Sequence, residues 1–215
     1  GVGETKVFYY RENSAASHLC PEDVTPALLD GVKVLHMSGI TPVLSESCLA
    51  MTKAAFALAK EKGVAISFDP NIRPESLSAE EVRELCRPVI EKASIIFPSK
   101  TEAALFTGCA TDEEGCRLWA DQGKLVVLKN GSEGCIIYQG NEKIPVPSFQ
   151  VEEVDPTGAG DTFCGAFLTA LIEGKPLSEC GRFACAAGAM SVRKQGPMEG
   201  APSRAELEAF LKAHS

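Results

Sequence analysis

The sequence predicts an α/β fold in which helices cover both faces of a mostly parallel β-sheet, giving a three-layer α/β/α sandwich. Short runs of β-branched and aliphatic residues alternate with longer helical segments along most of the 215 residues. Several of these runs are apolar throughout, which is typical of strands that are buried on both faces. Glycine or proline follows many of the runs and segments and marks where they end.

The expected strands are short and rich in Val, Ile, Leu and Phe, as β-propensity requires. They cover residues 5–11, 32–38, 64–68, 94–97 and 125–128. Residues 135–138 and 143–147 are expected to form a hairpin, because Gly140-Asn141 between them is typical of a tight turn.

The expected helices are bounded by cap residues and by helix-breaking residues. Ser45 caps a helix over 46–61 that stops before Gly63, and Ser78 caps one that runs to Lys92. The other helices are expected at 21–29, 99–107, 112–121, 160–173, 177–192 and 203–213.

Composition and charge narrow the class of protein. The net charge is −8 and no basic run occurs, which argues against nucleic acid and anionic membranes as partners. No apolar run approaches the length of a membrane span, and no signal peptide is recognisable. The nine cysteines are odd in number and contain no C-x-x-C, which predicts reduced thiols in the cytoplasm.

A turn of small residues leads directly into an apolar helix at residues 155–163. Gly158 and Gly160 permit backbone conformations in which successive N–H groups point the same way and bind an anion, assisted by the helix dipole. Asp161 lies at the mouth of this pocket. It is either a general base that takes a proton from a hydroxyl group or a residue that caps the helix.

Residues 155–163, Asp-Pro-Thr-Gly-Ala-Gly-Asp-Thr-Phe, resemble the C-terminal signature of the ribokinase-like (PfkB) family of carbohydrate kinases. The resemblance implies a ribokinase-like fold and an anion hole, made by Gly158, Ala159 and Gly160, that holds the transferring phosphate. It makes Asp161 both the catalytic base and a sugar contact. It also implies ATP and Mg²⁺ as cosubstrate and cofactor, with a requirement for K⁺ left open.

Polar residues follow four of the expected strands. Because ligands of such sheets bind beyond the carboxyl ends of the strands, these residues are expected to gather at one edge. They are Ser38-Gly39, Asp69 with Asn71 and Arg73, Ser99 with Glu102, and Lys129-Asn130-Gly131.

Two arginines suggest a substrate that carries a carboxylate. Residues 69–74 are either a surface turn, since Asp, Asn and Pro favour turns, or a rigid mount for Arg73 that grips an anion. Arg11, beside Tyr10 at the end of the first strand, could complete a two-arginine clamp. A neutral sugar would not need two guanidinium groups.

Two further segments have both a structural and a functional interpretation. Ser99-x-x-Glu102 fits a capping box, whereas the family resemblance implies that Glu102 helps to position Mg²⁺ indirectly. The family has Asn where this chain has Ser99. Residues 129–134 are either a simple turn or, by resemblance, a nucleotide contact. The nucleotide contacts that the resemblance implies are Asn71, Arg73, Lys129, Gly131 and Gly134.

Within the family, residues 7–17, 35–41 and 68–73 resemble 2-keto-3-deoxygluconate kinases. This implies ATP-dependent phosphorylation of a sugar acid to its 6-phosphate, with Tyr10, Arg11 and Arg73 holding the carboxylate end. The alternatives are a kinase of a neutral sugar, fructose or ribose, or of a nucleoside, and a truncated nucleotide-binding remnant without catalysis.

The family resemblance also implies a segment that precedes Gly1. Residues 1–12 are therefore expected to be the remnant of a largely absent β lid, and residues 13–215 a core domain that lacks its N-terminal strand. Such a core would have an unpaired sheet edge, which predicts a homo-oligomer.

Overall fold

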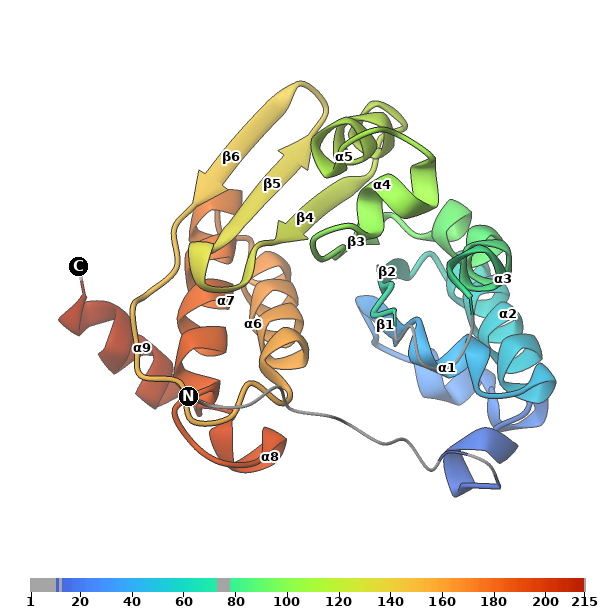
Figure 1. The fold of residues 1–215 in the computed structure, drawn as a ribbon. Coiled ribbons are helices and arrows are strands. Elements are labelled where there is room, and N and C mark those ends of the chain that lie inside the picture. The colour runs from blue at the N-terminus through green and yellow to red at the C-terminus, as the bar shows by residue number, and fades with distance from the viewer. Residues whose placement is uncertain (1–10, 12, 73–77, 215) are drawn as a thin grey trace.

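The computed structural model describes residues 11, 13–72 and 78–214, which fold around one six-stranded sheet (Figure 1). The strands lie in the order β1-β2-β3-β4-β5-β6. The first four are parallel, and the β4–β5 and β5–β6 pairs are antiparallel. Their bounds are β1 (Val34–Ser38), β2 (Ala65–Asp69), β3 (Ile95–Ile96), β4 (Leu125–Lys129), β5 (Cys135–Gln139) and β6 (Glu142–Val146).

The helices follow the strands in the alternating order that the sequence predicts. Their bounds are α1 (Ile40–Val43), α2 (Glu46–Glu61), α3 (Ala79–Lys92), α4 (Glu102–Thr107), α5 (Asp112–Asp121), α6 (Ala159–Ile172), α7 (Leu177–Ser191), α8 (Pro197–Gly200) and α9 (Arg204–Ala213). The side chains of Ser45, Ser78 and Ser203 accept N–H groups in the first turns of α2, α3 and α9.

The two faces of the sheet bury separate cores because successive strand residues point to opposite sides. Ile96 and Val126 pack against α2, α3 and α5, whereas Ile95 and Val127 pack against α6 and α7. Figure 1 shows the sheet between these two groups of helices, with α9 outside α7. The predicted three-layer α/β/α fold with a mostly parallel sheet is confirmed.

Local differences from the prediction have identifiable causes. The helix expected at 21–29 is two 3₁₀ turns, Pro21–Asp23 and Pro26–Leu29, because each proline starts a new turn. The helix expected from residue 99 begins at Glu102, after Thr101 adopts a left-handed conformation with φ of 74°. The short helices α1 and α8 were not predicted, since four residues carry little periodicity.

The strand expected at 5–11 and the lid remnant at 1–12 lie outside the described residues, apart from Arg11. Within the described sheet, β1 occupies one edge. None of the helices in the described part of the chain has the length and apolarity that crossing a membrane would demand.

Candidate active site

The glycine-rich turn before α6 enters the helix in a left-handed conformation. Gly158, the N-cap of α6, has φ of 78°. A Cβ on Gly158 would lie 2.6 Å from Cβ of Pro197, so the turn packs directly on α8. The Asp155 carboxylate fixes the turn by accepting the N–H groups of Thr157 and Gly196, each at 2.9 Å. These contacts hold the start of α6 in one orientation.

The N–H groups of Gly160 and Asp161 in the first turn of α6 have no acceptor among the described residues. Two such N–H groups at a helix start suit an anion. The Asp161 side chain is exposed and has no hydrogen bond or ion pair with the described residues. The capping interpretation of Asp161 needs a backbone N–H donor to this carboxylate, and the described residues provide none.

A buried ion pair joins the ends of two strands beside this turn. Lys129 at the end of β4 is paired with Asp69 at the end of β2, across the intervening β3. The Asp69 side chain is 3% exposed and that of Lys129 is 15% exposed. Burial works against the charge of Lys129, but the acidic groups around it, Asp69 included, outweigh burial and raise its pKa.

The Lys129 ammonium also lies at the glycine turn. A Cβ built on Gly160 would be 3.8 Å from Lys129 Nζ, so the ammonium lies close to the first turn of α6. Lys129, Ala159 and Gly160 line one cavity of about 240 Å³, together with Gly131 and Gly134. The two glycine-containing segments that the sequence singled out, 129–134 and 158–160, therefore meet in one cavity.

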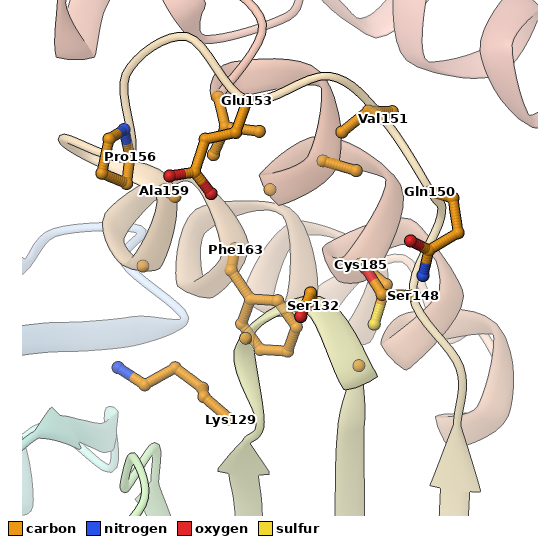
Figure 2. Close-up of a pocket in the computed structure, with 16 residues that line it drawn as sticks. Lys129, Ser132, Ser148, Gln150, Val151, Glu153, Pro156, Ala159, Phe163 and Cys185 are labelled. Atoms are coloured by element: carbon orange, nitrogen blue, oxygen red, sulfur yellow. The ribbon is translucent and has the colours of Figure 1, made fainter. Parts of the chain in front are cut away.

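Polar and apolar residues are mixed along the cavity, whose charged lining residues are Lys129 and Glu153. Figure 2 shows Lys129, Pro156 and Ala159 at one end, Ser148, Gln150 and Cys185 at the other, and Phe163 between them. Sequence reasoning assigned no role at this site to several residues that line the cavity. They include Val151, Phe163, Cys185, Gly188, Ala189 and Val192. The run of small residues at 184–189 in α7 is the signal that could have indicated a close approach here.

Glu102 ties two of the strand-end loops together. Its side chain is buried, and its two carboxylate oxygens accept the N–H of Ile72 at 2.8 Å and the N–H of Ser99 at 2.7 Å. The bond from Ser99 is one half of the expected capping box. The other half is missing because Thr101, and not Ser99, is the N-cap of α4. Ser99 itself bridges to Lys129 as an extension of the parallel sheet.

The remaining strand-end residues also meet at this edge. Asn71 has φ of 45° and donates its side-chain amide to Ser38 Oγ at 3.1 Å. The N–H of Gly39 donates to the Asp69 carbonyl at 2.7 Å, and a Cβ on Gly39 would lie 2.0 Å from the Pro70 carbonyl oxygen. The expected gathering of these loops is confirmed for the residues that the structure describes. Tyr10 and Arg73, two members of the proposed carboxylate clamp, lie outside the described residues, whereas Arg11 is described.

Comparison with known proteins shows the family to which this chain belongs. The model of the pfkB family of carbohydrate kinases matches residues 1–204 of the chain. The chain belongs to that family. Fructokinase-2 of Solanum lycopersicum is 34% identical over 220 residues, which cover 98% of this chain and 67% of the fructokinase. The PfkB chain thus spans about two thirds of the length of this relative.

Solved structures agree with this assignment. A proposed ribokinase II from E. coli, in complex with ATP and Mg²⁺, is 35% identical with a TM-score of 0.90. The matched region covers 96% of this PfkB chain and 67% of the ribokinase chain. A fructokinase double mutant from Vibrio cholerae, bound to fructose, ADP and potassium ion, is 31% identical with a TM-score of 0.77. The matched region covers 84% of this chain and 60% of the fructokinase chain. By name, these relatives are fructokinases and a ribokinase. They favour the neutral-sugar alternative over the expected 2-keto-3-deoxygluconate kinase.

Proposed function

We propose that this chain transfers the terminal phosphoryl group of ATP to a hydroxyl group of a neutral sugar, with fructose as the first candidate. The observation that carries the proposal is the meeting of Lys129 and Gly160 in one cavity, next to the exposed Asp161 carboxylate in the same helical turn, where the N–H groups of Gly160 and Asp161 have no acceptor among the described residues. Donors for phosphate charge and an acceptor for a proton are what phosphoryl transfer requires.

The residues that line the cavity suit a nucleotide. The Lys129 ammonium beside Gly160 would offer positive charge to the phosphates, while Val151, Ala189 and Val192 would offer apolar contacts to a base. Gly131 and Gly134 would let the backbone approach the nucleotide closely, because a side chain at either position would have to adopt φ of 59° or 103°.

Asp161 would accept the proton of the attacking hydroxyl group. Its exposure leaves it accessible to a sugar, and its place in the first turn of α6 keeps it beside the N–H groups that would hold the phosphate. Mg²⁺, when bound with the nucleotide, neutralises phosphate charge. Glu102 would act on Mg²⁺ through a bound water, because each of its carboxylate oxygens already accepts one N–H and retains a second lone pair.

The test is ADP release from MgATP with a panel of fructose, ribose, a nucleoside and 2-keto-3-deoxygluconate. Preference for fructose or ribose is the expected result. Preference for the sugar acid would instead support the second candidate, the arginine clamp that Arg11 and Arg73 suggest. Thermal protection by MgATP without ADP release for any acceptor would identify a nucleotide-binding protein and reject the proposed transfer.

A variant isolates the role of the base. Asp161→Asn should leave the affinity for MgATP within about twofold and lower turnover by about 10²–10⁴-fold, the usual range for a lost general base. Turnover within a few-fold of the parent protein would reject Asp161 as the base, even if the sugar preference were as proposed. Glu179→Gln on the exposed surface of α7 is the control for a generic loss of one carboxylate.

A further inference from the structure

The Asp69–Lys129 ion pair is buried more deeply than stability alone explains. Buried ion pairs seldom add net stability, because the cost of removing both charges from water is large. Asp69 is among the few fully buried charged side chains, and its Oδ1 atom has no hydrogen-bond partner among the described residues. Such an incompletely satisfied carboxylate lowers the stability of the fold, and a functional role would explain why it is present.

We propose that Asp69 is a positioning residue that holds the Lys129 ammonium beside Gly160 for contact with the phosphates of the nucleotide. This inference rests on the proposed nucleotide-binding function of the cavity. It adds a residue that touches neither substrate and acts through Lys129. Nothing in the sequence pattern marked Asp69 for this role beyond its place at the end of an apolar strand, β2.

The geometry restricts the lysine to one place. A lysine side chain has a flexible stem of four carbons, so the position of its ammonium is not fixed by the side chain itself. Asp69 and Lys129 both point to the α6 side of the sheet, since Ser67 and Val127, two residues before each, are buried and Val127 packs on that side. Asp69 Oδ2 accepts from Lys129 Nζ, and Cys164 of α6 lies 3.5 Å from the same oxygen. The ammonium is thereby held between the sheet and the start of α6.

Two donors of the ammonium remain available for an anion. A lysine ammonium has three N–H groups, and among the described residues Asp69 is its one hydrogen-bond acceptor. Lys129 lines the cavity and keeps 15% of its side chain exposed, whereas Asp69 lies behind it at 3%. A phosphate that enters the cavity would meet the ammonium first and the carboxylate only through it.

The carboxylate also contributes to keeping the lysine charged. Burial by itself favours the neutral amine, and the surrounding acidic groups, Cys164 first and then Asp69 through its charge and its hydrogen bond, raise the pKa of Lys129. The other titratable groups that face the pair are His36, Glu102, Asp161 and Cys164. Burial raises the pKa of the Cys164 thiol.

A double-mutant cycle on nucleotide binding tests the inference. Titration calorimetry would measure the dissociation constants of MgATP and of adenosine for the parent protein, Asp69→Asn, Lys129→Met and the double variant. We expect Lys129→Met to weaken MgATP binding by more than about tenfold and Asp69→Asn by about three- to tenfold. In the Lys129→Met background, Asp69→Asn should have no further effect. Adenosine, which lacks phosphates, should bind all four proteins within twofold.

Two controls separate positioning from general damage. Asp30→Asn breaks an exposed lysine–aspartate pair, Lys62–Asp30 at 2.5 Å, and should leave MgATP binding unchanged. In Asp69→Asn, binding should also weaken at a lower alkaline pH than in the parent, because Lys129 then loses its proton more readily. If Asp69→Asn does not fold, Asp69→Glu, which keeps the charge but displaces it, should weaken MgATP binding in the same way.

Several results would overturn the inference. MgATP binding by Asp69→Asn within twofold of the parent, or an equal loss of affinity with and without Lys129, would show that Asp69 does not act through the lysine. Those results would leave the proposed function standing. A parent protein that binds neither MgATP nor adenosine would instead refute the proposed function and the inference together.

Discussion

Gly158→Ala should destabilise the protein through two separable effects at the start of α6. The backbone of Gly158 has φ of 78°, and a left-handed conformation costs a residue with a Cβ about 1–2 kcal/mol. The new methyl group would also lie 2.6 Å from Cβ of Pro197, an overlap that shifts of backbone or side chain relieve at about 1–3 kcal/mol. The free energy of unfolding should therefore fall by about 2–5 kcal/mol.

Two other glycines isolate each effect. Gly174 has φ of 76°, but no atom lies within 4 Å of the place that a methyl group would take, so Gly174→Ala should cost only the conformational part, about 1–2 kcal/mol. Gly165 is exposed inside α6 with ordinary helical φ and open space around it. Gly165→Ala should stabilise the helix by about 0.5–1 kcal/mol.

Urea unfolding, followed by the fluorescence of the single, buried Trp119, would measure all three changes. The order of stability should be Gly165→Ala above the parent, then Gly174→Ala, then Gly158→Ala. If Gly158→Ala lost no more stability than Gly174→Ala, the overlap with Pro197 would not contribute to the loss in free energy of unfolding. The reasoning that this turn is fixed by packing on α8 would then be wrong.

Three further outcomes follow from the described contacts. Lys124→Met should lower the free energy of unfolding by about 1–3 kcal/mol in urea titrations, because Lys124 Nζ donates to three carbonyl groups at the end of α3; an unchanged midpoint would contradict this. The hydrogen bond from Thr157 and then that from the loop before α8 lower the pKa of Asp155, so its stabilising contribution is complete above about pH 4 and is lost as the pH falls further. Asp155→Asn should therefore show a shallower loss of thermal stability in acid than the parent, and parallel curves would count against it. Ellman's reagent should react quickly with Cys20 and Cys109, the two cysteines that are not buried, and with the other seven only after unfolding; more than two fast thiols in the native protein would show a looser core.

The periodic parts of the fold could be read from the sequence because they depend on short-range features. The Ser78 cap, the apolar run before Asp69 and the turn at Gly140 each act within a few residues, and the structure has helices, strands and a hairpin at these places. Elements without a period were missed or misplaced. Neither α1 nor α8 was expected, and α4 starts late because Thr101 adopts a left-handed turn.

The sequence by itself determined the three-layer fold, the glycine turn at 158–160 for which anion binding is proposed, and the edge of the sheet at which polar loops gather. Only the tertiary structure decided which groups meet there. It pairs Lys129 with Asp69, which is 60 residues away along the chain, and leaves Asp161 exposed. Propensities and caps are properties of neighbouring residues. Burial and ion pairing depend on how distant segments pack, and no local pattern records that distance.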